Sequence, residues 1–220
     1  MVNLLMVSDW RGERNEIVDF IKNALPQKLQ NDQLKCKILT ETDLHTCVFS
    51  RIDKFIQTKF ENWFILNEPY LDLNKSQKKK PDIVICRKKD KKMHPIVLIE
   101  LKENKRFSFT KKKTSIDGDT EKLIRILKEN KKKANWQRTG ITHNYLIFAI
   151  TSEDPEVIRK NDPEEIKKVL QGKVDNKLQD NGINKNRIEV IVISAFYSKD
   201  FEKRRQALET IRSLRKISLK

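Results

Sequence analysis

The chain has few of the residues that dominate fibrous, linker-like or disulfide-stabilised proteins. Only five Gly and six Pro occur in 220 residues, which excludes collagen-like, mucin-like and flexible-linker compositions, because those need glycine or proline in bulk. The three cysteines, Cys36, Cys47 and Cys86, form no CxxC or CxxH pattern, so the sequence indicates neither a disulfide framework nor a zinc site. We expect all three to be small buried apolar residues.

Long apolar runs are also missing. The longest, Tyr145 to Ile150 and Val190 to Tyr197, fall far short of the roughly 20 residues that a membrane-spanning helix needs. The first ten residues show no basic region ahead of an apolar one, so no secretory signal is visible. We therefore expect no membrane contact and a cytoplasmic protein.

Phosphate-binding loops and histidine clusters are absent from the sequence as well. It contains neither GxxxxGK[ST] nor GxGxxG, which excludes the ATPases and dinucleotide enzymes that depend on these loops. The three histidines, His45, His94 and His143, are scattered, and no histidine-based metal site or nucleophile-and-base pair is indicated.

Positive charge is what the chain has in excess. Lys and Arg number 47 against 31 Asp and Glu, a formal net charge of +16, and charged residues make up 35% of the chain where about 25% is usual. The segment from Lys75 to Arg138 holds 22 Lys or Arg against 8 Asp or Glu, so it carries most of this surplus. Two interpretations stay open, namely solvated loops and helix ends, or a surface that binds a polyanion such as nucleic acid.

Hydrophobic periodicity predicts alternating helices and strands. Three- and four-residue spacing of apolar residues predicts a helix over 13–30, which Pro26 is expected to end early, and a second from Leu44 to Phe60 capped by Thr42 or Asp43. Short apolar runs then predict three strands, a helix at Asp119 to Lys131 and a strand at Tyr145 to Ile150. A helix at Pro163 to Gln171, a strand at Ile188 to Ser194 and a helix at Phe201 to Leu214 follow. We expect an α/β protein of one domain, 1–220, with a core at about 43–150, the N-terminal helix and an extension at 151–220.

The middle strands bring charged residues together. The strands at 83–86 and 96–101 are expected to form a hairpin across the polar loop Lys88 to Met93, so that Asp82 lies opposite Glu100. Because side chains alternate along a strand, Glu100 and Lys102 share one face, about 7 Å apart. Packing explains two acids and a lysine beside apolar strands poorly, since buried unpaired charge is costly and like charges repel.

A hard divalent cation would resolve this conflict, because Mg²⁺ and Mn²⁺ prefer carboxylate oxygens. Lys102 could then position or deprotonate a water, or balance charge in the transition state. The alternative is an edge hairpin whose acids pair with the plentiful lysines.

These residues resemble the PD-(D/E)XK nuclease superfamily. Pro81-Asp82 is followed, after seventeen residues, by Glu100-Leu101-Lys102, within the order α–β–β–β–α–β. The resemblance implies a restriction-endonuclease-like αβββαβ core, a central mixed sheet flanked by helices on both faces. It also implies that Asp82 and Glu100 bind Mg²⁺, for which Mn²⁺ can substitute, and that Lys102 is catalytic.

Five further charged residues lie in or near the elements that carry this pattern. Glu68 either completes the metal site or caps a turn, and Glu41 and Glu61 are weaker candidates for an acid from a helix. Asp119 is a plausible helix N-cap. Lys122 could point toward the site, as a polar residue does in some members, but we expect it to face solvent, where it could contact nucleic acid.

The leading hypothesis is a Mg²⁺-dependent endonuclease that hydrolyses phosphodiester bonds, with DNA as the expected substrate and RNA left open, and that could act as a homodimer. The basic side chains expected to contact nucleic acid are Lys78, Lys79, Lys80, Lys105, Arg106, Lys111, Lys112, Lys122 and Arg138. The alternatives are a non-catalytic nucleic-acid-binding module on the same fold and a lysine-rich protein-binding scaffold.

Overall fold

Five strands form one mixed sheet. The computed structural model describes residues 10–35, 37–38, 40–69, 80–89, 91–104, 116–132, 141–151, 162–194 and 206. The strands are β1 (Trp63–Asn67), β2 (Ile83–Lys89), β3 (Lys92–Asn104), β4 (His143–Ile150) and β5 (Glu189–Ile193), in the spatial order β1-β2-β3-β4-β5. β1, β2 and β3 pair antiparallel, whereas β3, β4 and β5 pair parallel. The expected mixed α/β architecture is therefore confirmed.

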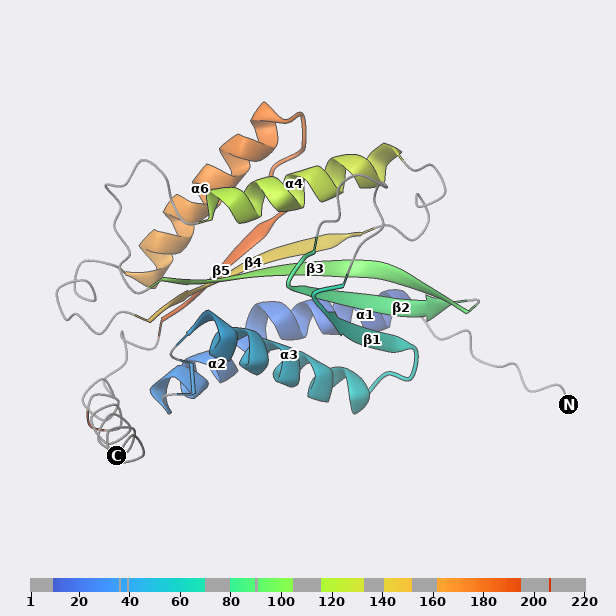
Figure 1. Cartoon of the computed structure of the whole chain (residues 1–220), viewed down its shortest axis with the longest axis horizontal. Helices are drawn as coiled ribbons and strands as arrows, with labels where there is room; N and C mark the ends of the chain where they lie inside the picture. Colours follow the sequence, from blue (N-terminus) through green and yellow to red (C-terminus); the bar gives the residue numbers. More distant parts are fainter. Residues whose placement is uncertain are drawn as a thin grey trace, which may run out of the picture.

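Helices cover both faces of this sheet (Figure 1). On one face lie α1 (Trp10–Asp19), the π-helical segment η1 (Phe20–Ala24), α2 (Leu25–Leu34) and α3 (Glu41–Gln57). On the other lie α4 (Asp117–Lys132) and α6 (Pro163–Asp180), which connect the parallel strands. The site-bearing strand β3 is thus covered from both sides.

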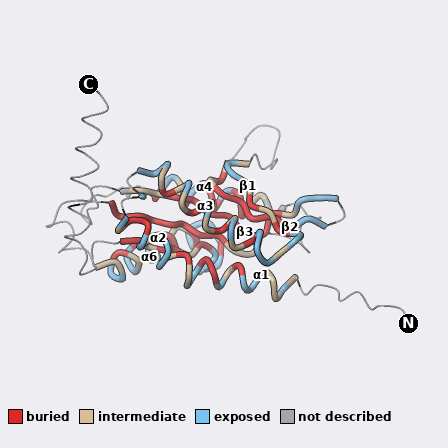
Figure 2. Tube along the Cα trace, turned by 90° about the horizontal axis from the view of Figure 1, so that it is seen from below, coloured by how far each residue is buried: buried red, intermediate tan, exposed pale blue. Residues whose placement is uncertain are grey.

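Alternation along β3 divides the core into two layers. Val97 and Ile99 pack with the apolar residues of α1 to α3, whereas Leu98 packs with those of α4 and α6. Buried residues accordingly run through the middle of the molecule, with exposed positions on the outer helix surfaces (Figure 2). The same parity turns Glu100 toward α4, where it is fully buried.

Pro26 does not end the N-terminal helix, contrary to expectation. Helical structure continues from Trp10 to Leu34, and Pro26 lies in the first turn of α2, directly after η1. The wider π-turn accommodates a proline, which has no N–H to donate and whose ring would clash with the carbonyl four residues earlier in a regular helix. Ile17, Ile21 and Leu25 are fully buried along this continuous helix.

The N-cap of α3 lies earlier in the sequence than Thr42 or Asp43, which were the predicted caps. Thr40 is the N-cap: its side chain accepts from the Asp43 N–H at 3.2 Å, and the Asp43 carboxylate accepts from the Thr40 N–H at 3.0 Å. This reciprocal capping box starts the helix at Glu41 and places that acid at the end of α3 nearest β3.

The β2–β3 hairpin is longer than predicted. Lys88, Lys89, Lys92 and Met93 belong to the strands rather than to a loop, since Lys88 lies opposite Met93 and Lys89 opposite Lys92. A register irregularity between Ile85 and Cys86 absorbs one residue. Ile83 lies opposite Ile99, so the pairing extended by one residue places Asp82 opposite Glu100, as the sequence predicted.

Two other boundaries and one cysteine also differ from expectation. α4 begins at Asp117, so Asp119 lies inside its first turn and is not the N-cap. α6 extends to Asp180, because Val174 and Leu178 continue its buried face beyond Gly172. Cys86 is buried, which raises the pKa of its thiol to about 12, but Cys47 is only half-buried. Cys36 and the helix expected at 201–214, apart from Gln206, lie outside the described residues.

Within the part of the chain that the structure describes, no helix combines the length and the apolar character needed to cross a membrane.

The packing of α2 on α3 can be tested at a buried ion pair. Asp32 is 2% exposed and accepts from Arg51 Nε at 3.0 Å and Nη2 at 2.7 Å. We expect Asp32→Ala to lower the free energy of unfolding by about 2 kcal/mol, because it removes a two-point hydrogen-bonded pair while Arg51, which is partly exposed, regains some hydration. Urea denaturation in EDTA measures this, with exposed Asp180→Ala as the control. A loss no larger than that of the control would contradict a stabilising role for the pair.

Candidate functional site

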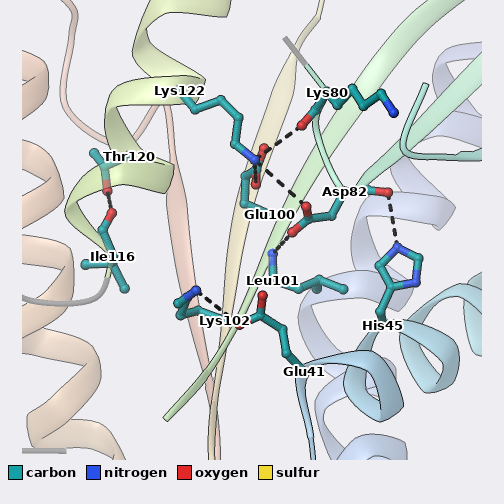
Figure 3. Close-up of polar contacts among 10 residues, drawn as sticks. All are labelled: Glu41, His45, Lys80, Asp82, Glu100, Leu101, Lys102, Ile116, Thr120 and Lys122. Atoms are coloured by element: carbon teal, nitrogen blue, oxygen red, sulfur yellow. Dashed lines mark hydrogen bonds and ion pairs between the residues drawn. The ribbon is translucent and has the colours of Figure 1, made fainter. Parts of the chain in front are cut away.

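Charged side chains from four segments meet where the β2–β3 pairing ends. Asp82 precedes β2, Glu100 and Lys102 lie on β3, Lys122 lies on α4, and Glu41 opens α3 (Figure 3). Sequence positions up to 81 residues apart are thereby brought to one end of the hairpin.

Asp82 is held in place through its backbone and its side chain. Its carbonyl oxygen accepts from the Glu68 N–H at 2.8 Å and lies 3.2 Å from His45 Nε2. Because a carbonyl can only accept, His45 carries its proton on Nε2 in this contact. The carboxylate Oδ2 accepts from the Leu101 N–H at 2.7 Å. These contacts leave Oδ1 directed toward α4 and Lys122 (Figure 3).

Glu100 is the buried acid of the site. Its side chain is 1% exposed, and its Oε2 lies 2.5 Å from Lys122 Nζ. Lys122 Nζ also lies 3.8 Å from Asp82 Oδ1 and donates to the Lys80 carbonyl at 3.2 Å. Glu100 Oε1 is buried and has no hydrogen-bond partner among the described residues. One ammonium therefore serves two carboxylates and a carbonyl, and one carboxylate oxygen remains unsatisfied.

Burial changes the protonation of Glu100 strongly. Removal from water raises its pKa most, the negative charge of Asp82 adds to this rise, and the Lys122 ammonium offsets only part of it, so that the pKa is raised to about 9. For Lys122, burial lowers the pKa, but the ion pair with Glu100 and the charge of Asp82 outweigh burial, so its pKa is raised. Lys122 is thus a firmly protonated cation.

Lys102 lies at the outer part of the cluster and contacts a different acid. Its Nζ is 3.1 Å from Glu41 Oε2, and a Glu41 oxygen also accepts from the Glu103 N–H at 3.4 Å. Burial lowers the pKa of Lys102, but the hydrogen bond and charge of Glu41 exceed this effect, so its pKa is raised. Lys102 therefore keeps its charge and is a poor proton acceptor.

Asp119 adds a fourth acid to the cluster. It is half-buried in the first turn of α4, and its Oδ2 has no hydrogen-bond partner within the described part of the chain. Burial raises its pKa, while the nearby charges of Lys102 and Lys122 lower it, and the net shift is upward. Asp119 and Lys122 are three residues apart and so project from neighbouring positions on one side of the helix.

The predicted residues differ in how they relate to this cluster. Asp82, Glu100 and Lys102 are brought to the same end of β3. Glu68 is exposed and has a positive φ of 40°, and it meets Asp82 through its backbone N–H, as a turn residue does. Glu61 is exposed in the turn before β1.

Lys122 was expected to face solvent, and this prediction is wrong. The first turns of α4 pass over Glu100, whose buried carboxylate draws the ammonium inward. Lys80 contributes its carbonyl to that ammonium. The other predicted nucleic-acid contacts, namely Lys78, Lys79, Lys105, Arg106, Lys111, Lys112 and Arg138, lie outside the described residues.

Sequence reasoning missed the roles of His45 and Asp119 and gave Glu41 little weight. The Thr40-x-x-Asp43 capping box was a usable signal for Glu41, since it places that residue in the first turn of α3. The i, i+3 spacing of Asp119 and Lys122 was a weaker signal. Nothing in the sequence pointed to the contact of His45 with the Asp82 carbonyl.

Metal-ligand geometry was also sought in the described residues. No group of three or more His, Cys, Asp or Glu side chains among them is arranged to hold a metal ion. The Lys122 ammonium instead lies beside the carboxylates of Asp82 and Glu100.

The chain matches no family model, no curated protein and no solved structure.

The raised pKa of Glu100 predicts how stability depends on pH. The folded protein keeps a proton that the unfolded chain releases above about 4.5, so this contribution to stability is complete at low pH and is lost as pH rises through about 9. We expect wild-type stability to fall relative to Glu100→Gln between pH 5 and 9, by at most about 1.4 kcal/mol per pH unit. Thermal unfolding in EDTA, with exposed Glu165→Gln as the control, measures the difference. Parallel pH profiles for wild type and Glu100→Gln would contradict the assigned shift.

Proposed function

We propose that the protein is a metal-dependent endonuclease that hydrolyses phosphodiester bonds in DNA, with a restriction-endonuclease-like core. The observation that carries this proposal is the convergence of Asp82 and the buried Glu100 on one cation-binding position, with Lys102 at its rim. The order α3-β1-β2-β3-α4-β4 supports it, since a mixed sheet with this αβββαβ order is what the sequence motif implies.

The donor set fits a hard divalent cation. Asp82 Oδ1, Glu100 and the Lys80 carbonyl supply the oxygen ligands that Mg²⁺ prefers, and Glu100 Oε1 has no hydrogen-bond partner among the described residues. Four carboxylates, those of Glu41, Asp82, Glu100 and Asp119, face the two ammonium groups of Lys102 and Lys122. When all are ionised, two negative charges remain, which a divalent ion would balance. Asp82 and Glu100 would hold that ion, and when bound it would polarise the scissile phosphate and activate a water.

The environment of Lys102 favours one of the roles open to a catalytic lysine. Because its pKa is raised, Lys102 stays protonated and cannot readily accept a proton from water. As a cation it can stabilise the negative charge that develops on phosphate oxygens. Glu41, at 3.1 Å, positions this ammonium rather than reacting itself.

Nucleic acid is the substrate that the charge of the chain favours. A formal net charge of +16 attracts the phosphate backbone, and about 14 of these charges belong to the segment 75–138 that contains the site. A duplex cut on both strands needs two sites, so a homodimer is part of the proposal.

A non-catalytic nucleic-acid-binding module is the second candidate. One observation favours it: the Lys122 ammonium lies beside both acids, 2.5 Å from Glu100 Oε2 and 3.8 Å from Asp82 Oδ1. The two candidates share DNA binding that weakens steeply with salt, but only the nuclease requires Asp82 and Glu100 for its activity.

Cleavage of plasmid DNA separates the two. We expect nicking or cutting with Mg²⁺ or Mn²⁺ and none with EDTA, and we expect Asp82→Asn, Glu100→Gln and Lys102→Met to reduce the rate at least about 100-fold. Single-stranded DNA is assayed in parallel. The matched control is Lys54→Met, an exposed lysine of α3, which should cut like wild type.

Filter binding at several salt concentrations accompanies the cleavage assay. The three site variants should still bind DNA, because long-range attraction depends on the basic residues and not on the acids. If wild type and Glu100→Gln bind DNA equally and neither cuts it with any metal ion, the protein is the non-catalytic module and not a nuclease.

A further inference from the structure

Lys122 holds the position that a metal ion would need. Its Nζ is 2.5 Å from Glu100 Oε2, 3.8 Å from Asp82 Oδ1 and 3.2 Å from the Lys80 carbonyl oxygen. These three oxygens come from β3, from the residue before β2 and from the segment ahead of it, and Figure 3 shows them around one ammonium. A hard divalent cation would seek the same two carboxylates and carbonyl.

The ammonium and the metal ion exclude each other. A cation bound by both carboxylates would lie within a few ångströms of Lys122 Nζ, where two positive charges in a site shielded from water repel strongly. Glu100 is 1% exposed, so solvent does little to screen that repulsion. One of the two cations must therefore leave.

The lysine is able to move. Its side chain is 22% exposed and has four rotatable methylene groups. Asp119, one helical turn earlier, offers a second negative group, and its Oδ2 has no hydrogen-bond partner among the described residues. The site thus contains both the acids that hold the Lys122 ammonium and a second acid, Asp119, toward which the ammonium can move.

We propose that Lys122 is an exchangeable counter-ion: it holds Asp82 and Glu100 together before metal binds, and a divalent ion displaces its ammonium toward Asp119. The exchange rests on the metal site of the proposed function but does not require that the protein cut DNA. It makes Lys122 a positioning residue that sets the affinity of the site for metal.

Metal binding without DNA tests the exchange. Calorimetric titration with Mn²⁺ should give a dissociation constant about tenfold or more lower for Lys122→Met than for wild type, because the competing charge is gone. Lys122→Arg retains the cation and should bind no tighter than wild type. Lys128→Met is the matched control, since Lys128 lies on the same helix but contacts Asn181 Oδ1 at 2.7 Å instead of the acids. Unchanged or weaker Mn²⁺ binding by Lys122→Met would overturn the proposal.

A second measurement uses the wild-type chain and so does not depend on a variant that folds. Lysines are acetylated briefly with and without Mn²⁺, and the modified peptides are quantified by mass spectrometry. Lys122 should be modified at least about threefold more with Mn²⁺ than with EDTA, because an amine released from an ion pair reacts more readily, whereas Lys128 should not change. Equal modification of Lys122 under both conditions, in protein that binds Mn²⁺, would overturn the exchange.

The outcomes also separate this inference from the nuclease. If Mn²⁺ binds and releases Lys122 but DNA is not cut, the exchange is supported and the proposed nuclease activity is contradicted. If cleavage depends on metal but Lys122 is not released, the nuclease activity is supported and the exchange is contradicted. If the wild-type protein binds no Mn²⁺, both proposals are contradicted.

Discussion

Burial of the Glu100 carboxyl group is the constraint on which the rest of the site depends. A carboxylate that is 1% exposed in an apolar layer must be neutralised by a proton or by a neighbouring cation. The protein uses both means, since the pKa of Glu100 is raised to about 9 and the Lys122 ammonium lies 2.5 Å away. The buried residues Leu123, Ile126 and Leu127 pack α4 on the sheet, and its first turns thereby bring Lys122 to Glu100. A fold selected for stability alone would place an aliphatic residue at position 100, so the buried acid points to a function.

The site lies where it does because the two hairpin strands differ in length. β2 begins at Ile83, opposite Ile99, whereas β3 continues to Asn104 beside β4. Leu101 therefore projects an N–H past the start of β2, and the Asp82 carboxylate accepts it at 2.7 Å in place of a strand carbonyl. The step that ends the hairpin thus also orients one carboxylate toward the other. Asp82 thus both ends the hairpin pairing and supplies one carboxylate of the acid pair.

The parts of the fold and site that follow from local periodicity could be predicted from the sequence. Strand parity placed Glu100 and Lys102 on one face and Asp82 opposite Glu100, and the apolar runs gave the order of the described strands. The contacts of Lys122 could not be predicted, because they depend on how α4 is positioned over β3, and no local pattern states that. A lysine on an amphipathic helix faces water unless a buried charge lies within its reach. The place of Asp119 in the charged cluster could not be predicted for the same reason. Its expected role as a helix cap followed from its residue type and not from its neighbours in the fold.

Two lysines at one site have different environments, and this difference determines what each can do. Lys102 is held at the rim by Glu41, a half-exposed acid, at 3.1 Å, so its ammonium remains available to a phosphate group that approaches from solvent. Lys122 is held by a fully buried acid and is committed to the interior until another cation replaces it. The two positions are therefore not equivalent, although both hold a protonated lysine within one cluster. Because an ion pair with a buried carboxylate is much less screened than one at the surface, the depth of the acid partner decides which lysine stays accessible from solvent and which one is held at the acid pair.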